Sequence, residues 1–211
     1  MATAARSPTN NDREAPLVKR YGDPYQHFRD WFAQAEDAEP SFPEAFALAT
    51  ADRNGVPAVR IMLLKGYDER GFVFFTNLES RKGGEIAENP AVSMCFHWKS
   101  LEKQVRIEGP VEPVGAEEAD AYFATRPRAS QLGAWASRQS RPLSGRFELE
   151  AEVARYTAKF NVGEVPRPPH WSGFRLRPER VEFWRQYAFR LHDRLEYRRG
   201  DGGWESRYLF P

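Results

Sequence analysis

The chain has 211 residues, enough for one domain whose hydrophobic core needs no disulfide or metal to hold it together. Its 31 basic and 30 acidic residues give a formal net charge of +1, which argues against a general nucleic-acid binder. Cys95 is the single cysteine, so an intrachain disulfide and a thiolate metal cluster are excluded. No apolar run reaches the roughly 20 residues of a membrane span and no apolar signal core is present, so a cytoplasmic protein is expected.

The N-terminal segment differs in character from the rest of the chain. Residues 1–22 are polar and lack apolar periodicity, which predicts a mobile arm ahead of a single domain over residues 23–211. Asp23-Pro24 predicts the start of a helix, because apolar residues then recur at helical spacing over residues 27–35.

Short apolar runs separated by turns follow, a pattern typical of antiparallel strands. The predicted strands cover residues 45–51, 57–66, 72–76, 91–98, 104–114, 171–184, 189–199 and 204–209. Amphipathic helices are predicted at 117–125 and 143–160, and the segment 129–140 between them is rich in Ser, Gln, Gly and Trp. Because no regular βαβ alternation occurs, the pattern favours a barrel, mainly β with peripheral helices, over a doubly wound sheet.

Basic side chains recur beside hydroxyl and amide side chains, the combination that holds phosphate where no glycine-rich loop does. The clusters are Arg60 and Lys65 around Ile61–Leu64, Arg81-Lys82 after Thr76-Asn77 and Ser80, Arg126 and Arg128 near Ser130, and Arg138 before Gln139-Ser140. Any one of them taken alone is more simply an ordinary surface charge, since 29% of the residues are charged.

Two groups of basic and polar residues are spaced so that they would share one face of a helix or a strand. Tyr122, Arg126 and Ser130 are four residues apart, which aligns them on one helix face, although Pro127 disfavours helix at Arg126 and predicts a kink there.

Arg190, His192 and Arg194 share one face if residues 189–199 form a strand. These cationic groups repel one another unless an anion or an aromatic ligand relieves the cost. A solvated face explains them equally well.

An ordered series of motifs resembles the pyridoxamine 5'-phosphate oxidase family from about residue 23 to the end of the chain. In chain order they are Arg60-Ile61-Met62-Leu63-Leu64-Lys65, Phe75-Thr76-Asn77, Ser80-Arg81-Lys82, Tyr122-Phe123 with Arg126-Pro127, Gln131–Ser140, Pro166-Arg167-Pro168-Pro169-His170-Trp171 with Gly173, Glu182-Phe183-Trp184 and Arg190–Arg194. The resemblance implies an FMN-binding split barrel and a homodimer with two active sites at the subunit interface.

The resemblance also implies roles for matching positions. FMN would be held by Arg60, Ile61, Met62, Leu63, Leu64, Lys65, Phe75, Thr76, Arg81, Lys82, Gln104, Gln139, Ser140, Trp184 and Arg194. Phe75 stands where many members carry tyrosine, so it offers its backbone but no hydroxyl. The phosphate of the B6 substrate would be held by Lys65, Tyr122, Arg126 and Ser130, with the catalytic pair Arg190 and His192 over the pyridine ring.

The implied reaction converts pyridoxamine or pyridoxine 5'-phosphate to pyridoxal 5'-phosphate. A hydride equivalent passes from the carbon bearing the amine or alcohol to the flavin, and O2 reoxidises the flavin to give hydrogen peroxide. Two alternatives stay open: a related split-barrel oxidase acting on another substrate, such as a phenazine precursor, and a flavin- or haem-carrying binding module without turnover. Retention of Lys65, Tyr122, Arg126 and Ser130 counts against the first.

One departure from the family pattern carries a structural expectation. The segment between Trp184 and Arg190 usually contains a glycine, whereas here it reads Arg185-Gln186-Tyr187-Ala188-Phe189. A tight turn without glycine predicts backbone strain in this segment.

Overall fold

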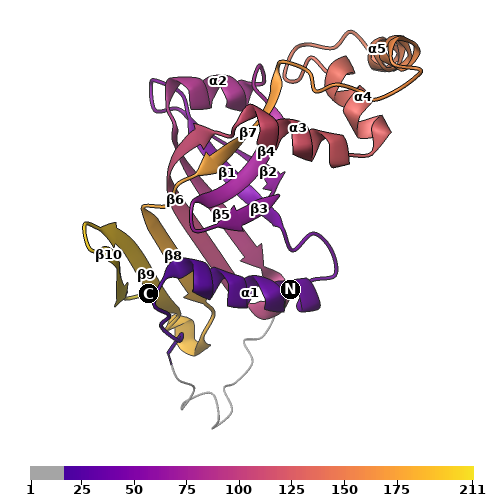
Figure 1. The fold of residues 1–211 in the computed structure, drawn as a ribbon. Helices are drawn as coiled ribbons and strands as arrows, with labels where there is room; N and C mark the ends of the chain where they lie inside the picture. The colour runs from indigo at the N-terminus through magenta and orange to yellow at the C-terminus, as the bar shows by residue number, and fades with distance from the viewer. Residues whose placement is uncertain (1–16) are drawn as a thin grey trace.

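The computed structural model describes residues 17–211, which form a strand-rich domain with helices around it (Figure 1). The strands are β1 (Ala45–Ala51), β2 (Pro57–Leu63), β3 (Gly66–Asp68), β4 (Gly71–Asn77), β5 (Ala91–Trp98), β6 (Lys103–Pro113), β7 (Trp171–Leu176), β8 (Arg180–Arg185), β9 (Asp193–Gly200) and β10 (Gly203–Tyr208). The helices are α1 (Pro24–Ala38), α2 (Arg81–Glu88), α3 (Ala116–Thr125), α4 (Arg128–Ala136) and α5 (Arg146–Lys159), with 3-10 turns η2 (Lys99–Leu101) and η3 (Ala188–Arg190). None of these helices is long and apolar enough to cross a membrane.

The strands form one sheet along the path β10-β9-β8-β6-β5-β1-β2, and β7, β4 and β3 continue from β6. Strand β6 belongs to both parts, because residues 103–108 pair with β8 and residues 111–113 pair with β7. The change of partner occurs at Gly109, where a Cβ would lie 2.1 Å from the carbonyl oxygen of Arg177. Glycine is therefore required there. The predicted fold class, mainly β with peripheral helices in a barrel, is confirmed.

Aromatic side chains fill the interior of the curled sheet. Helix α1 begins as predicted, where the Asp23 carboxylate accepts a hydrogen bond from the backbone N–H of Gln26 at 2.8 Å. The buried face of α1 places Phe28 against Phe72 and Phe96, at ring-centroid distances of 4.9 and 5.2 Å. Burial of one such side chain contributes about 1.5–3 kcal/mol, so packing on this face fixes α1 across one end of the sheet (Figure 1).

Several elements differ from the prediction, among them helix α2, which the sequence pattern does not predict. The predicted strand 171–184 is divided into β7 and β8 at the segment that contains Pro178, which has no N–H to donate to a strand ladder. Helix α4 occupies most of residues 129–140, for which the sequence pattern predicts no helix. Its apolar face is narrow, with Leu132 and Ala136 buried.

Residues 17–22, the end of the predicted arm, contact the C-terminal strands. Val18 is buried, and its carbonyl oxygen accepts a hydrogen bond from the Tyr208 hydroxyl at 2.9 Å. The backbone N–H of Tyr21 donates to the Tyr197 hydroxyl at 3.0 Å. These contacts join residues 17–22 to the domain, and the rest of the predicted arm, residues 1–16, lies outside the described residues.

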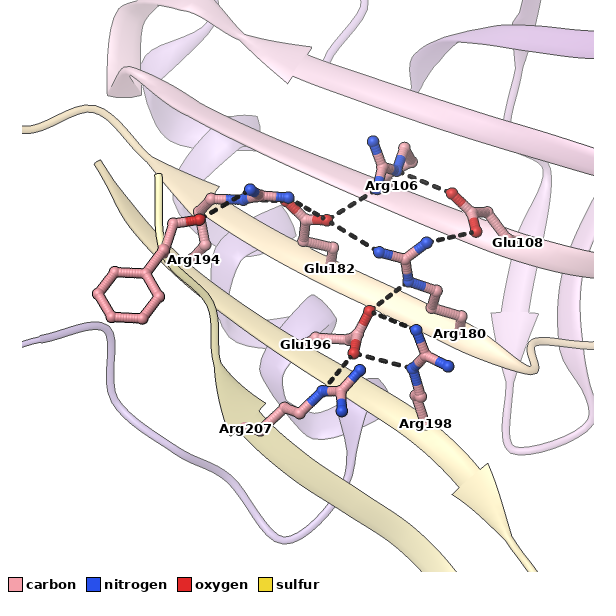
Figure 2. Close-up of polar contacts among 9 residues, drawn as sticks. Arg106, Glu108, Arg180, Glu182, Arg194, Glu196, Arg198 and Arg207 are labelled. Carbon is pink, nitrogen blue, oxygen red and sulfur yellow. Dashed lines mark hydrogen bonds and ion pairs between the residues drawn. The ribbon is translucent and has the colours of Figure 1, made fainter. Parts of the chain in front are cut away.

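A buried carboxylate ties strands β8, β9 and β10 together. Glu196 is fully buried, and it accepts hydrogen bonds from Arg180, Arg198 and Arg207 (Figure 2). Burial alone raises the pKa of Glu196, but the hydrogen bonds from Arg198, Arg207 and Arg180 outweigh it and hold this pKa at about 2, against an ordinary 4.5.

A carboxyl group whose pKa is depressed in the folded state stabilises the fold above its unfolded pKa and loses that effect as the pH falls through the folded value. We therefore expect the stability difference between the wild-type protein and Glu196→Gln to be largest above about pH 4.5 and to shrink toward pH 2. Urea unfolding at a series of pH values, at one protein concentration, measures this difference. A difference that does not change with pH would contradict the pairing of Glu196 with its arginines.

Candidate functional site

A cavity of about 420 Å³ opens beside β4, between β2 and helices α2, α3 and α4. It is lined by Met62, Phe75, Thr76, Asn77, Lys82, Arg126, Ser130, Gly133, Ala134, Ser137, Gln139 and Trp171. The lining contains residues from both predicted groups, those for the flavin and those for the substrate phosphate. The sequence motifs did not single out Asn77, Ser137 and Trp171 as site residues, although each of the three lies inside one of them.

Lys82 is a buried cation at one side of this cavity, in the first turn of α2. Its Nζ donates to the Ser80 hydroxyl at 3.3 Å and to Oε1 of Gln139 at 3.2 Å, and both acceptors are neutral. Burial lowers the pKa of Lys82, the nearby Arg60 lowers it further, and Glu85 opposes both. Because a buried charge is costly unless paired, Lys82 favours an anion in the cavity.

Arg126 is a second cation on this cavity, and its side chain is half-buried. It follows α3 with an extended backbone (φ −72°, ψ 146°), so the predicted break in the helix before Pro127 is confirmed. Its guanidinium lies over the Trp171 ring, 4.7 Å from the centroid. The buried Nη1 has no hydrogen-bond partner among residues 17–211, and burial lowers the pKa of Arg126. Arg126 lines the cavity and has an unpartnered guanidinium N–H, a combination that favours an anionic ligand there.

Aromatic rings form the wall between the two cations. Phe75 stacks on Tyr122 at a centroid distance of 4.1 Å and on Trp171 at 5.3 Å. Phe75 lies opposite Gly173 in the β4–β7 pair, where a Cβ would come within 2.7 Å of the Phe75 ring. Gly173 thus makes room for Phe75, and Phe75 holds Tyr122 beside Arg126.

The start of α2 organises the remaining predicted phosphate ligands. The backbone N–H of Arg81 donates to the Ser140 hydroxyl at 3.2 Å, which ties Ser140 to the positive end of the helix. The side chains of Arg60 and Arg81 both pair with the buried Glu85, at 3.0 and 2.7 Å. Arg60 therefore points toward α2 from β2 instead of outward.

Several predicted residues lie elsewhere. Gln104, Trp184 and Arg194 lie directly opposite one another on β6, β8 and β9, so their side chains share one face of the sheet. This face is at the other end of the sheet from helices α3 and α4 (Figure 1). Seven residue steps along β6, about 23 Å at 3.3 Å per step, separate Gln104 from Val111, where pairing with β7 begins.

Arg190 does not lie on a strand, and the prediction that it shares a strand face with His192 and Arg194 is wrong. Phe189 and Arg190 have left-handed backbones (φ 56° and 63°), and β9 begins only at residue 193. This is the strain expected of a tight turn without glycine, and it ends the strand pattern. His192 still reaches the predicted flavin residues, because its ring lies 4.7 Å from that of Trp184 and its Nδ1 accepts from the Tyr187 N–H.

The remaining predicted residues lie on β2 or directly after it. Lys65 is exposed and does not line the cavity, and Ile61 is 68% exposed on the face away from the core. Leu63 is half-buried and Leu64 is buried, so of the residues 61–64 only Met62 reaches the cavity wall.

Comparison with known proteins connects this geometry to a family. The profile described as "Pyridoxamine 5'-phosphate oxidase" matches residues 32–160, and the profile "Pyridoxine 5'-phosphate oxidase C-terminal dimerisation region" matches residues 171–211. The chain belongs to the pyridoxamine 5'-phosphate oxidase family. The resemblance found in its motifs is thereby confirmed, and strands β7–β10 are the family's dimerisation region.

Several family members are closely similar over nearly their whole length. A protein of Maricaulis maris named "Pyridoxine/pyridoxamine 5'-phosphate oxidase" is 59% identical over 202 residues, covering 95% of this chain and 91% of the relative. A protein of the same name from Chelativorans is 55% identical over 208 residues, 98% of this chain and all of the relative.

The crystal structure of PhzG from Burkholderia lata, in complex with tetrahydrophenazine-1-carboxylic acid, has a TM-score of 0.85 and 32% identity, over 99% of this chain and 100% of that one. An FMN-binding protein of Nostoc punctiforme shares the fold, with a TM-score of 0.70 at 19% identity, over 87% of this chain and 97% of that one.

Two adjacent glycines in α2 test how closely this helix packs against Leu78, directly after the end of β4. A Cβ on Gly83 would lie 2.1 Å from the Leu78 carbonyl oxygen, whereas a Cβ on Gly84 would meet nothing within 4 Å. We expect Gly84→Ala to stabilise the protein by about 0.5–1 kcal/mol through helix propensity, and Gly83→Ala to destabilise it by about 1–3 kcal/mol. Chemical denaturation of both variants measures this, and equal effects would show that α2 does not depend on contact with Leu78.

Proposed function

We propose that the chain is an FMN-dependent oxidase that converts pyridoxamine 5'-phosphate and pyridoxine 5'-phosphate to pyridoxal 5'-phosphate. The observation that carries the proposal is a pair of cations on one cavity, the buried Lys82 and the half-buried Arg126, with no carboxylate within ion-pair distance of either among residues 17–211. Two separate cations suit a site that receives two phosphate groups, one from the cofactor and one from the substrate. The names of relatives at 55–59% identity support the same reaction.

The residues around Lys82 fit the phosphate of FMN. Lys82 has only neutral hydrogen-bond acceptors, and Ser140 is fixed beside it by the Arg81 N–H at the positive end of α2. Thr76 and Gln139 add polar groups to the same wall. When bound, FMN supplies the acceptor for a hydride from the substrate carbon, and O2 regenerates it with release of hydrogen peroxide.

The residues around Arg126 fit the phosphate of the substrate. Arg126 and Ser130 line the cavity, Nη1 of Arg126 has no hydrogen-bond partner among residues 17–211, and Phe75 of the same wall stacks on Tyr122. In this proposal the protein binds the phosphate here and thereby orients the amine- or alcohol-bearing carbon. Lys65, which is exposed in the single chain, is assigned to the same phosphate by family resemblance.

The second half of the site is proposed to come from a second copy of the chain. Gln104, Trp184 and Arg194 are turned away from the cavity of their own chain, and they lie in or beside the family's dimerisation region. A two-fold homodimer would place this face of one chain over the cavity of the other. Arg190 and His192, next to this face, would then lie over the substrate ring, where a planar guanidinium can stack as an ammonium cannot.

A phenazine-type substrate is the second candidate. Its support is the structural similarity to PhzG, with a TM-score of 0.85. Identity to that protein is 32%, against 55–59% to the relatives named for the B6 substrates, and the cavity is lined by Arg126 and Ser130, with Tyr122 stacked behind Phe75. These observations favour the phosphorylated B6 substrate.

The proposed reaction is tested by loading the purified protein with FMN and measuring hydrogen peroxide release with pyridoxamine 5'-phosphate. We expect steady turnover with this substrate and much less with pyridoxamine, because the dephosphorylated compound cannot engage Arg126. FMN uptake without turnover would support a binding module, and failure to take up FMN would refute the proposal.

Arg126→Ala separates the two phosphate sites. A guanidinium hydrogen bond to phosphate contributes about 1.5–3 kcal/mol, so we expect KM for pyridoxamine 5'-phosphate to rise about ten- to a hundredfold. The affinity for FMN should change by less than about threefold. Arg146→Ala is the matched control, because Arg146 is an exposed arginine on α5 that does not line the cavity. Equal losses for both ligands would show that the two phosphates are assigned wrongly.

Mixing of variant chains tests whether each site draws on both copies. Lys82→Ala and Arg194→Ala homodimers are each damaged in both sites, but a mixed dimer keeps one site with neither change. Random reassociation should restore about a quarter of the wild-type activity, measured at limiting FMN. Lys82→Ala mixed with Arg126→Ala is the control, because both residues line the same cavity and no intact site can form. No recovery in the first mixture would contradict a shared site.

A further inference from the structure

Arginine and glutamate side chains cover the face of β6, β8, β9 and β10 that lies opposite the core (Figure 2). Glu182 and Glu196 lie directly opposite each other on β8 and β9, and both are at least 97% buried. Two carboxylates in this position repel each other, so each needs its own cations. The arginines around them are Arg106, Arg180, Arg194, Arg198 and Arg207.

Glu182 holds Arg194 in a two-point contact. Nε of Arg194 donates to Oε1 of Glu182 at 2.8 Å, and Nη2 donates to Oε2 at 3.1 Å. This geometry fixes the plane of the guanidinium as well as its position. Arg106 donates to the same Oε2 at 2.8 Å, so the carboxylate is itself held from the β6 side.

Residues at the C-terminus also form hydrogen bonds with Arg194. Nη1 of Arg194 donates to the carbonyl oxygen of Phe210 at 2.9 Å, and the N–H of Leu209 donates to the carbonyl oxygen of Arg194 at 2.9 Å. The two hydrogen bonds to Glu182 and the one to Phe210 use three of the five N–H groups of the guanidinium and leave two for a ligand.

Arg194 stands where this charged face meets the predicted flavin residues. It lies directly opposite Trp184, which lies opposite Gln104. We infer that Glu182 is a positioning residue for the flavin: it orients the Arg194 guanidinium so that its two remaining N–H groups face the cofactor. This inference rests on the proposed function, and it assigns a role to a side chain that does not itself touch the cofactor.

Glu196 provides a matched control in the same network. It is a fully buried glutamate on the same face, and it too accepts from several arginines, namely Arg180, Arg198 and Arg207. None of these three is a predicted flavin residue. Arg180 also lies 3.6 Å from Oε2 of Glu182, so the two glutamates share one arginine, but Glu196 makes no direct contact with Arg194. Loss of charge at Glu196 therefore disturbs the network while leaving the direct partners of Arg194 in place.

The experiment compares Glu182→Gln with Glu196→Gln in FMN titrations of the apo-dimer, followed by quenching of flavin fluorescence. We expect Glu182→Gln to weaken FMN binding about tenfold and Glu196→Gln to change it less than about twofold. The melting temperature of each apo-protein is measured alongside, and it should be lower than that of the wild type for both variants. If Glu182→Gln does not give folded protein, Glu182→Asp, which keeps the charge but shortens the reach, makes the same comparison.

A double-mutant cycle shows whether Glu182 acts through Arg194. If it does, Glu182→Gln adds less than about twofold to the loss caused by Arg194→Ala. Losses that multiply, or equal losses for Glu182→Gln and Glu196→Gln, would overturn the inference. If the wild-type protein and Glu182→Gln bind FMN equally well, the inference is overturned but the proposed function is not. Wild-type protein that binds no FMN would overturn both the inference and the proposed function.

Discussion

The partner change of strand β6 at Gly109 is the constraint on which the arrangement of the site depends. Up to residue 108 this strand pairs with β8, and from residue 111 it pairs with β7. Only glycine lets the crossing segment come as close as the Arg177 carbonyl does. One long strand thus pairs at one end with β7, whose Trp171 lines the cavity, and at the other end places Gln104 opposite Trp184 of β8. In the proposed function, a second copy of the chain brings these two ends together in one site.

The regular elements of this fold follow from local pattern, and the exceptions have local causes. Alternating apolar residues predict the strands closely because half-buried strands need that alternation. Helix α4 escapes prediction because its buried face is only Leu132 and Ala136 beside a buried Gln131. The strand predicted through residue 190 fails because Phe189 and Arg190 adopt left-handed backbones, which sequence pattern disfavours in residues other than glycine.

The site is harder to predict from sequence, because the sequence shows which residues are charged but not which of them form ion pairs. The net charge of +1 hides the difference between arginines held by buried glutamates and the two cations at the cavity. Arg60 and Arg81 look like free phosphate ligands in sequence, yet both pair with Glu85. Arg126 looks equally ordinary, and only its burial beside Trp171 without a hydrogen-bond partner for Nη1 within residues 17–211 sets it apart. Tertiary contacts decide which cation is available.

The same distinction explains why buried ion pairs are kept on the outer face of β8 and β9. Replacing a buried ion pair with well-packed apolar side chains is often neutral or stabilising, so stability alone does not account for Glu182 and Glu196. An apolar residue at position 182 can fill the same volume but cannot fix the plane of a guanidinium. Arg194 needs that fixed plane if its two unused N–H groups are to meet a ligand at a defined angle. Orientation, and not the strength of the pair, is what the carboxylate of Glu182 contributes.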